Sequence, residues 1–537
     1  MKRLLLPGII ALFAVAPAFA QKQSEPPRWE ALKAAYLYEA PKSIAAKEQA
    51  VVEHDAIRIT VSFTDIRGES VPGILLTPTG KGPFPCVVLL HGLGGSKEQL
   101  LDLVGPELTK KGFAVFAIDA KLHGERKREG EDPKQPLTFV ALVPDTVRDW
   151  RQALDWLCQR EDIKANRIGL VGYSMGAIMG AILAGVDERI QASCLCVGGD
   201  PIKPMLALVP ENLRALGEFA SPSNYIGHAS PRPVYLVNGT KDTTITPDSA
   251  RRLIAAAKQP RVSVWVDSGH ILPAPEVRKG IDWVTNRLSL PQSAERYADP
   301  GAPDKIEIAP VDDPECRVER LTFTNANKES VAGLYVRPKT GDGPFPLVLV
   351  IHGRGHSKER MLNTMKREFA ARGVAALALD AAFHGDRAPK DGKDPDPEVL
   401  FTTTIRDYRQ VLPWVLEQPT INPNQIGVLG FSMGAMMGTI LTGLDLRLQA
   451  AALCVGGELE TLPELARPAA YAAFIAERPV CFVNGHKDPM VSEAAALKLH
   501  AAAKEPKTVI WYNEPDHTLP KPTLHLGTDW LIEKLKK

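Results

Sequence analysis

The strongest constraint on the fold is that most motifs of this 537-residue chain occur twice, in the same order. GYSMGAIMG at 172–180 returns as GFSMGAMMG at 430–438, so the two central serines lie 258 positions apart (432 − 174). KGPFPCVVLLHGLGGSKE, DAKLHGER and VNGTKD in the first half return as DGPFPLVLVIHGRGHSKE, DAAFHGDR and VNGHKD in the second. Two copies of one domain explain this order, so the fold of one copy must also be the fold of the other.

Each copy alternates short apolar runs with stretches of helical periodicity. CVVLL, AVFAI, IGLVG and VYLVN are typical of buried strands, whereas VRDWRQALDWLCQ at 147–159 has the spacing of a helix with one apolar face. This alternation predicts two tandem α/β domains built of βαβ units, each with a mostly parallel, doubly wound sheet covered by helices. RITVSFTD followed by GILLTP alternates like an antiparallel pair, which predicts a hairpin at the N-terminal edge. The segments 175–241 and 433–487 leave room for a small cap.

Two segments of unusual composition bound these domains. Residues 1–20 have a basic start, an apolar core and a small-residue end (AFA), which is typical of a secretory signal. A Pro- and Asp-rich stretch at 288–315 is typical of a linker and predicts a boundary near residue 298. The expected organisation is a signal peptide (1–20) and two domains (21–298 and 299–537), in an exported protein that is periplasmic or secreted.

Composition argues against several kinds of partner. A formal net charge of +1, without a basic stripe, gives no reason to expect nucleic acid as a ligand. No second stretch approaches the about 20 apolar residues of a transmembrane helix, so no integral membrane segment is expected after signal removal. The seven cysteines are expected as small core hydrophobes rather than as a disulfide framework. No cofactor or metal is expected, because HGRGH at 352–356 lacks an evident third ligand.

The repeated G-x-S-x-G lies between an apolar run and a helix-like stretch, where it predicts a nucleophile elbow. Such a sharp turn exposes the hydroxyl of Ser174 or Ser432, and the flanking glycines let the strand and the helix approach closely. One match would be weak evidence, whereas two matches at equivalent repeat positions are strong. We therefore expect both serines to be nucleophiles.

A serine nucleophile needs a base, and the base needs an orienting acid. Downstream of Ser174, Asp242 follows one strand-like run (VYLVNGTKD) and His270 follows the next (SVWVDSGH). The second copy repeats this order, which gives the predicted catalytic set Ser174, Asp242, His270, Ser432, Asp488 and His517. Asp267 and Asp516 are rival acids, but each lies within three residues of its histidine, too close to reach round to the ring.

Acyl transfer also requires hydrogen-bond donors for the oxyanion. In each copy one donor should be the backbone N–H after the serine, and the other should come from the glycine-rich loop HGLGG or HGRGH. The predicted donors are the N–H groups of Leu93, Met175, Arg354 and Met433. His91 and His352, which begin these loops, are expected to support them. His123 and His384 either contact substrate or brace their turn, and a brace is favoured.

With these motifs, both copies resemble α/β-hydrolases of the dienelactone hydrolase-like and acetyl-esterase-like groups, over nearly all of the chain after residue 20. The resemblance implies a serine esterase that forms an acyl-enzyme on small-molecule carboxylic esters, with small or carbohydrate-borne acyl groups and no cofactor. The chain departs from dienelactone hydrolase itself, whose nucleophile is a cysteine.

Two alternatives stay open at this point. The chain could be a peptidase or amidase of the same fold, or one copy could be catalytic while the other is an impaired binding or structural domain. The two loops also differ, because Arg354 stands where the first copy has Leu93. The arginine side chain either meets an anionic group of the substrate or faces water.

Overall fold

The chain divides into two compact units, domain 1 (Met1–Ser289) and domain 2 (Leu290–Lys537). This division precedes the predicted boundary near residue 298, because Tyr297 is fully buried in the core of domain 2. The predicted signal peptide at 1–20 lies outside the described residues. The computed structural model describes residues 29–39, 44–53, 55–205, 214–389, 395–514, 516–517 and 521–537.

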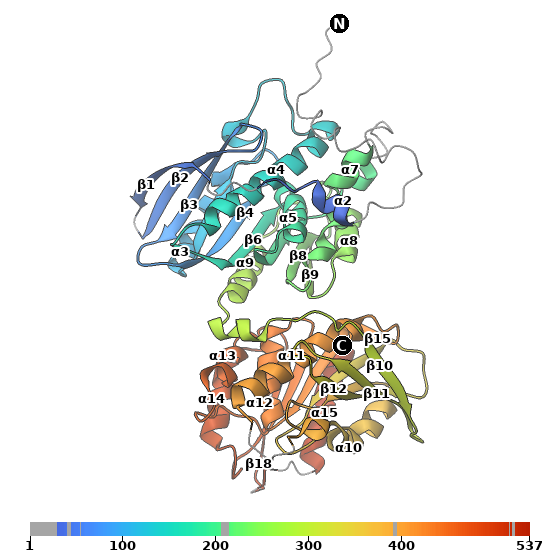
Figure 1. The fold of residues 1–537 in the computed structure, drawn as a ribbon. Helices are drawn as coiled ribbons and strands as arrows, with labels where there is room; N and C mark the ends of the chain where they lie inside the picture. The colour runs from blue at the N-terminus through green and yellow to red at the C-terminus, as the bar shows by residue number, and fades with distance from the viewer. Residues whose placement is uncertain are drawn as a thin grey trace. The chain divides into compact units, whose positions relative to one another are not determined.

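Domain 1 is built on a nine-stranded sheet with the order β1-β2-β3-β5-β4-β6-β7-β8-β9 (Figure 1). The first three strands pair antiparallel with their neighbours, so the predicted edge hairpin is extended by one more strand, and the other strands are parallel. The strands are β1 (Ala46–Glu53), β2 (Ala56–Thr64), β3 (Ser70–Pro78), β4 (Phe84–Leu90), β5 (Ala114–Ile118), β6 (Ile163–Tyr173), β7 (Ile190–Cys196), β8 (Val234–Gly239) and β9 (Arg261–Val266).

Domain 2 repeats this sheet strand for strand, in the order β10-β11-β12-β14-β13-β15-β16-β17-β18. The prediction of two α/β sheets with antiparallel edges is therefore confirmed. The strands are β10 (Ile306–Val311), β11 (Cys316–Thr324), β12 (Ser330–Pro338), β13 (Phe345–Ile351), β14 (Ala375–Leu379), β15 (Ile421–Phe431), β16 (Ala450–Cys454), β17 (Val480–Gly485) and β18 (Lys507–Tyr512).

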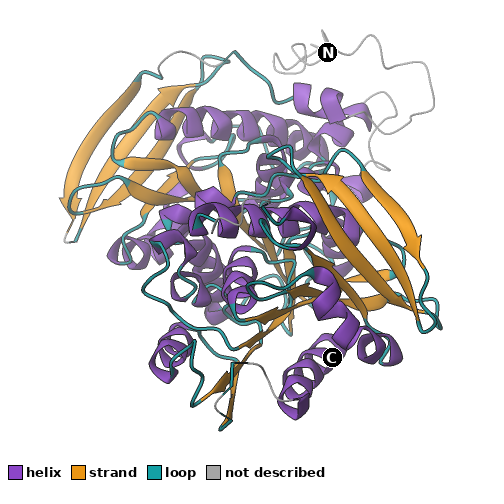
Figure 2. Ribbon diagram, turned by 60° about the horizontal axis from the view of Figure 1, so that its bottom comes forward, coloured by secondary structure: helices purple, strands orange, loops and turns teal. Residues whose placement is uncertain are grey.

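Helices cover both faces of each sheet (Figure 2). In domain 2 one face packs against α10 and α15, and the other against α11, α12 and α14. The helices of domain 1 are α2 (Trp29–Ala34), α3 (Lys97–Lys110), α4 (Pro136–Cys158), α5 (Met175–Val186), α6 (Ile202–Met205), α7 (Arg214–Ala220), α8 (Pro247–Ala256) and α9 (Ala274–Leu288). Those of domain 2 are α10 (Lys358–Ala371), α11 (Pro397–Leu416), α12 (Met433–Leu444), α13 (Ala469–Ala472), α14 (Glu493–Ala502) and α15 (Lys521–Lys536).

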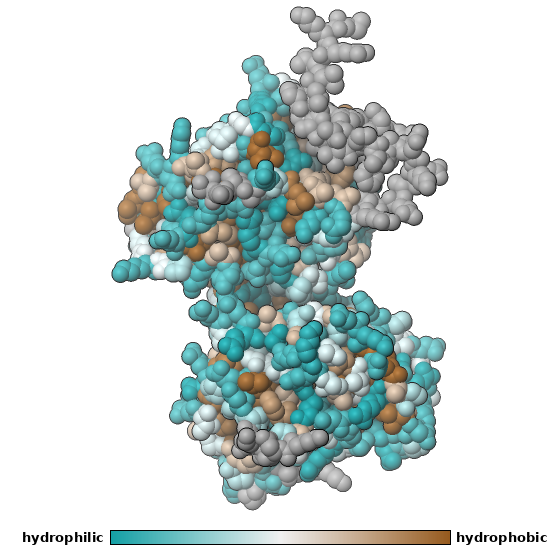
Figure 3. Space-filling model, in the orientation of Figure 1, coloured by the Kyte–Doolittle hydropathy of each residue, from teal (hydrophilic) through white to brown (hydrophobic). Residues whose placement is uncertain are grey.

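Burial follows the position of each strand in its sheet. Every residue of β5 and β14 is buried, as expected for parallel strands that helices cover on both faces. The outermost antiparallel strands, β1 and β10, are mostly exposed, with Val52 71% and Ile308 45% accessible. Brown, hydrophobic patches lie over β1 and near β10 on a face that is otherwise mostly hydrophilic (Figure 3).

In each domain a short segment precedes the sheet, at 29–39 in domain 1 and 292–297 in domain 2, and this segment is named the strap. Tyr36 in domain 1 and Tyr297 in η6 (Gln292–Tyr297) in domain 2 are 261 positions apart (297 − 36). Their hydroxyls donate to the carbonyls of Phe219 and Leu465, at 2.5 and 2.9 Å. The repeat unit therefore starts before the first motif that is visible in the sequence, which is why the boundary falls at 289.

The cap between β7 and β8 is small in the part of the chain that the structure describes. It holds α6 and α7 in domain 1, and a short 3₁₀ turn, η8 (Glu464–Ala466), followed by α13 in domain 2. Residues 206–213, which belong to this cap segment of domain 1, lie outside the described residues. No described helix combines the length and apolarity that a bilayer crossing requires.

Candidate active site

The two serines lie on identical strand-to-helix turns. Ser174 joins β6 to α5 with φ 55°, and Ser432 joins β15 to α12 with φ 53°, in a region that L-residues rarely adopt. A Cβ at Gly172 would lie 2.4 Å from the carbonyl oxygen of Gly176, and one at Gly176 would lie 2.0 Å from that of Leu90. The flanking glycines are thus a steric requirement of the turn, as the motif predicts.

In domain 1 the turn brings the serine to a histidine and an acid from two later loops. His270 Nε2 lies 2.9 Å from Ser174 Oγ, and His270 Nδ1 lies 2.8 Å from Asp242 Oδ2. The other oxygen of Asp242 accepts hydrogen bonds from the N–H groups of Thr244 and Ile245, at 2.8 and 2.9 Å. The buried carboxylate is therefore held in place and orients the imidazole.

Domain 2 has the same arrangement. His517 Nε2 lies 2.7 Å from Ser432 Oγ, and His517 Nδ1 lies 2.8 Å from Asp488 Oδ2. Oδ1 of Asp488 accepts from the N–H groups of Met490 and Val491 at 2.8 and 2.9 Å. The structure thus brings together all six residues that the sequence singled out, in two separate hydrogen-bonded sets.

The rival acids are placed elsewhere. Asp267 is 76% exposed and pairs with Lys241 Nζ at 2.7 Å rather than with His270. In domain 2 the backbone carbonyl of Asp516 accepts a hydrogen bond from Tyr512, while the carboxylate on His517 is that of Asp488. Each imidazole therefore receives its carboxylate from the earlier loop.

The glycine-rich loops lie directly beside the serines. A Cβ at Gly92 would be 3.5 Å from Ser174 Cβ, and one at Gly353 would be 3.4 Å from Ser432 Cβ. The loops thus place Leu93 and Arg354 next to the turns that carry Met175 and Met433. This is the neighbourhood that an oxyanion hole requires, and the donor roles of the four N–H groups remain a prediction.

The histidines that open these loops are structural. His91 Nδ1 bonds the Gly92 carbonyl at 2.9 Å, and Nε2 accepts the N–H of Ala120 at 3.1 Å. His352 makes the same two bonds, to Gly353 and Ala381. Burial lowers the pKa of His91 and of His352 to about 4, so both rings stay neutral with both nitrogens engaged. Neither ring is available as the general base.

A buried carboxylate ties each of these loops to a neighbouring turn with the sequence DAKLHG (119–124) or DAAFHG (380–385), named the D-x3-HG turn after its shared residues. Asp119 accepts from the N–H of Lys97 at 2.8 Å, from Lys97 Nζ at 3.0 Å and from the N–H of Glu125 at 3.0 Å. A Cβ at Gly124 would lie 2.2 Å from this carboxylate, so only glycine fits there. Domain 2 repeats the contacts with Asp380, Lys358 and Asp386. His123 and His384 belong to these braced turns, and their Nδ1 atoms bond the carbonyls of Lys121 and Ala382.

Backbone strain concentrates at the same edge of each sheet. Besides the serines, Leu122 and Val197 in domain 1 have φ of 63° and 46°. Phe383 and Val455 at the equivalent positions have φ of 61° and 50°. A bulky or β-branched residue rarely holds such a conformation, and residues that do so cluster at functional sites. The sequence contains no local signal for these four positions, since none of them is a glycine.

A tyrosine that the sequence reasoning missed fixes each histidine loop. In domain 1, Tyr173 next to the serine donates to the carbonyl of His270 at 3.0 Å and accepts from Leu272 N–H at 3.1 Å. Domain 2 has Phe431 there, and Tyr512 from the last strand donates instead to the carbonyl of Asp516 at 2.9 Å. The two copies therefore use tyrosines from different strands for one task, which a motif comparison does not reveal.

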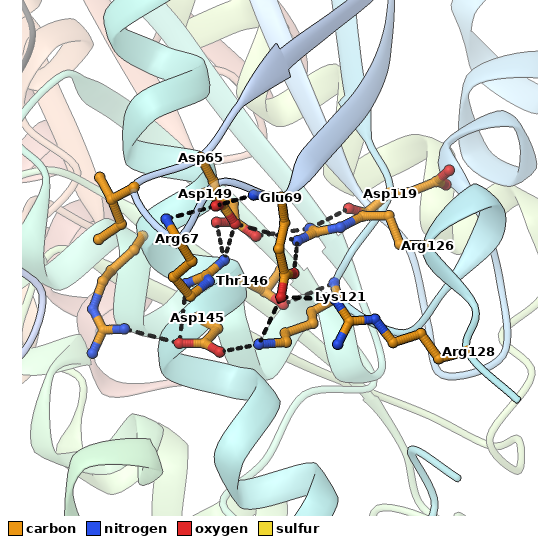
Figure 4. A network of polar contacts seen from close by, with 12 residues as sticks. Asp65, Arg67, Glu69, Asp119, Lys121, Arg126, Arg128, Asp145, Thr146 and Asp149 are labelled. Carbon is orange, nitrogen blue, oxygen red and sulfur yellow. Dashed lines mark hydrogen bonds and ion pairs between the residues drawn. The ribbon is translucent and has the colours of Figure 1, made fainter. Parts of the chain in front are cut away.

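An ion-pair network lies behind the D-x3-HG turn of domain 1 and joins it to α4 and to the β2–β3 turn (Figure 4). Arg67 pairs with Asp65, with Asp149 at 2.5 Å and with Asp145 at 3.0 Å. Arg126 in the turn pairs with the other oxygen of Asp149 at 2.7 Å. Lys121 Nζ pairs with Asp145 at 2.5 Å. The network therefore connects the D-x3-HG turn to α4 and to the β2–β3 turn. These contacts are additional to those that the Asp119 carboxylate makes with the same turn.

The described side chains form no cluster of three or more His, Cys, Asp or Glu residues suited to a metal ion. All seven cysteines lie in the described part of the chain and are free thiols. The arrangement that the structure does provide, a serine at a strained turn with a histidine and a buried carboxylate, is that of a nucleophilic acyl-transfer site.

Comparison with known proteins matches each domain separately. The Dienelactone hydrolase family matches residues 71–271, and the Esterase FrsA-like family matches residues 312–470. YtaP of Bacillus subtilis is 29% identical over 167 residues, which cover 28% of this chain and 56% of YtaP. Esterase EstD of Thermotoga maritima is 28% identical over 169 residues, which cover 30% of this chain and 37% of EstD.

A further curated relative and a solved structure also match part of the chain. Esterase FrsA of Escherichia fergusonii is 28% identical over 145 residues, 27% of this chain and 33% of FrsA. The acetyl xylan esterase from Paenibacillus sp. R4 is matched over 48% of this chain and 92% of its own, with 18% identity and a TM-score of 0.41. The matched regions span only 33% to 56% of YtaP, EstD and FrsA. The Dienelactone hydrolase family model matches one half and the Esterase FrsA-like model the other, so the chain is a tandem dienelactone hydrolase-like α/β hydrolase.

Proposed function

We propose that the protein is an exported serine esterase with two active sites, which hydrolyses small-molecule carboxylic esters through an acyl-enzyme. The observation that supports this most strongly is the pair of hydrogen-bonded Ser–His–Asp sets, with serine-to-histidine distances of 2.9 and 2.7 Å. Export rests on the secretory character of residues 1–20.

The chemistry follows from the geometry. Ser174 Oγ attacks the ester carbonyl while His270 Nε2 takes its proton, and the N–H groups near the serine stabilise the oxyanion. Collapse breaks the bond to the alcohol oxygen, which leaves with the proton from His270. Water, deprotonated by the same histidine, then attacks the acyl-serine and releases the carboxylic acid and the free serine. Ser432 and His517 perform the same steps in domain 2.

Ester turnover by single-site variants tests this function. We expect Ser174→Ala and Ser432→Ala each to remove the turnover of one site, and the double variant to lose both. Turnover that survives in the double variant would contradict the proposal. A single variant that already abolishes all turnover would mean that the other copy is an impaired binding or structural domain.

The same variants separate an esterase from a peptidase or amidase. Esters and anilides with one shared acyl group differ only in the leaving group. We expect kcat/KM for the ester to exceed that for the anilide at both sites, and the reverse order would favour the amidase alternative. The small cap allows access to compact acyl groups, including those carried by carbohydrate.

A further inference from the structure

The two sheets end in equivalent strands that differ in chemistry. β1 and β10 each pair with one neighbour, and no other described strand pairs with their outer edges (Figure 1). All of β1 after Ala46 is exposed. An unpaired edge is a template for a further strand, and proteins usually blunt such an edge with proline or with charges.

The outer edge of β10 is blunted by a proline, whereas that of β1 is not. Pro310 pairs with Glu319 of β11. The residues 260 positions earlier on both strands (310 − 50 and 319 − 59) are Ala50 and Ile59, which pair in the same way. Proline has no N–H, so it fits an edge strand only where its nitrogen points away from the neighbouring strand. The N–H of Ala50 therefore points outward and is a donor that β10 lacks.

The outward backbone groups of β1 form a row. In an antiparallel pair the N–H and C=O of one residue point to the same side, and the side alternates from residue to residue. Glu48, Ala50 and Val52 therefore each present a donor and an acceptor at the free edge. The carboxylate of Glu48 is already paired, because it accepts from Trp156 Nε1 at 3.1 Å and from Arg160 Nη1 at 2.9 Å.

We propose that β1 pairs antiparallel with β1 of a second copy of the chain, so that two domain 1 sheets join across a two-fold axis. In this register Ala50 faces Ala50 of the second copy, and Glu48 faces Val52 twice. Each of the three facing pairs exchanges two hydrogen bonds, about six in all. The assembly is closed at two copies, because a two-fold axis uses the same edge of both.

The charged side chains of β1 complement each other in this register. Lys47 faces Glu53 of the second copy, twice by symmetry, and opposite charges on facing residues stabilise a sheet. Lys47 is exposed and has no ion-pair partner among the residues that the structure describes. Arg58 Nη1 lies 3.8 Å from the carboxylate of Glu53 and closer, at 3.3 Å, to that of Asp102, so the existing contact of Glu53 is weak.

The same register would be unfavourable for β10. Pro310 stands at its centre and offers no donor. Glu307 and Asp313 hold the two charged positions, so the facing charges would both be negative. Like charges on facing residues destabilise a sheet. The outer edge of β1 is thus suited to pairing with a second copy, whereas that of β10 is protected from it.

Sedimentation velocity of the full chain tests this pairing. Because about six hydrogen bonds and two exposed ion pairs form a small interface, we expect a dimer that dissociates on dilution between about 100 and 1 µM protein. Ala50→Pro copies the residue of β10 and removes one donor from each copy, so it should raise the dimer dissociation constant by about 100-fold. Pro310 shows that this register accepts a proline, and circular dichroism checks that the variant is folded.

A charge exchange tests the register. Lys47→Glu and Glu53→Lys each place like charges opposite each other twice, so each should raise the dissociation constant by about tenfold. The variant with both substitutions restores opposite charges and should return to within about threefold of the original value. Glu307→Lys makes the same kind of change in β10 and should leave the association unchanged.

Three results would overturn the pairing. The first is a monomer at every concentration, and the second is a dimer or larger species that persists undiminished in Ala50→Pro. The third is a double charge exchange that associates no better than the two single variants. None of these measurements depends on ester turnover, so their outcome is independent of the proposed function.

Discussion

The polar network behind the D-x3-HG turn differs between the two domains, although the turn itself is the same. In domain 1 two acids and two bases, Asp65, Arg67, Lys121 and Asp145, take part in the network (Figure 4). Domain 2 has neutral residues at all four equivalent positions: Asn325, Asn327, Ala382 and Thr403. Two positive and two negative charges are exchanged, so the net charge of the region is unchanged.

The polar residues that remain in domain 2 hold its D-x3-HG turn in the same way. Asn325 donates to Asp407 at 2.9 Å, and Arg387 pairs with the other oxygen of Asp407 at 2.7 Å. Asn327 bonds Thr403 at 3.2 Å where domain 1 has the Arg67–Asp145 pair. Burial raises the pKa of Asp407, and that of the equivalent Asp149, to about 6 despite the adjacent arginines. One buried Asp–Arg pair is thus common to both domains, whereas the surrounding charges are replaceable.

The largest expected effects fall on the residues that are identical in both copies. Asp242→Asn and Asp488→Asn remove the carboxylate that orients the histidine, so kcat should fall by about 10⁴-fold at the affected site. The measurement is ester turnover by each variant in the background where the other serine is alanine. Effects that differ by more than about tenfold between the two sites would show that the two sets are not equivalent.

The network provides the next largest difference. Arg67→Ala leaves Asp65 and Asp149 buried without this partner, so it should lower the unfolding free energy of domain 1 by about 3–5 kcal/mol. Asn327→Ala removes a hydrogen bond to Thr403 and a long, exposed one from Arg406 but no ion pair, so it should cost domain 2 about 1 kcal/mol. Urea unfolding of the full chain measures both changes.

A transplant serves as the control for this difference. Replacing Asp65, Arg67, Lys121 and Asp145 with the four neutral residues of domain 2 removes both signs of charge together. Such exchanges of a whole buried set are often neutral, so the stability should change by no more than about 1 kcal/mol. A loss as large as that of Arg67→Ala alone would mean that the charges themselves stabilise domain 1.

The loop histidines are expected to respond to pH alike in both domains. Their folded-state pKa of about 4 lies below the unfolded value of about 6.5, so the unfolded chain binds more protons between these values. Stability should therefore be fully present above pH 6.5 and should fall as the pH drops toward 4. The contribution is about 3 kcal/mol for each histidine. His91→Gln and His352→Gln should each flatten this dependence by a similar amount, and an unchanged pH profile would contradict the buried neutral state.

The smallest effect tests the two tyrosines. Tyr173→Phe removes two hydrogen bonds that hold the His270 loop, and Tyr512→Phe removes one that holds the His517 loop. Each should lower kcat/KM at its own site by about fivefold, the equivalent of a neutral hydrogen bond. Phe431→Tyr should not add to the activity of domain 2, because Tyr512 already binds its loop. A gain from Phe431→Tyr would show that the two positions are not alternatives.

Much of this arrangement could be predicted because the repeat supplies an internal comparison. GYSMG and GFSMG, VNGTKD and VNGHKD mark the serine and acid positions twice, and chain order assigns each histidine. The strap could not be found in this way, because Tyr36 and Tyr297 lie in short segments whose neighbours differ. Leu122 and Val197 are strained only because the completed sheet holds them there, and Tyr512 substitutes for Tyr173 from another strand. Such features depend on tertiary packing, which no local pattern contains.

The central claim is that both serines are activated nucleophiles, and labelling with a fluorophosphonate followed by intact-mass measurement tests it most directly. The reagent phosphonylates serines that an adjacent histidine activates. We expect two adducts on the unaltered protein, one in Ser174→Ala, one in Ser432→Ala and none in the double variant. A protein that takes no adduct, or one whose adducts persist in the double variant, would contradict the account. A single adduct would mean that one of the two hydrogen-bonded sets does not work as a nucleophile.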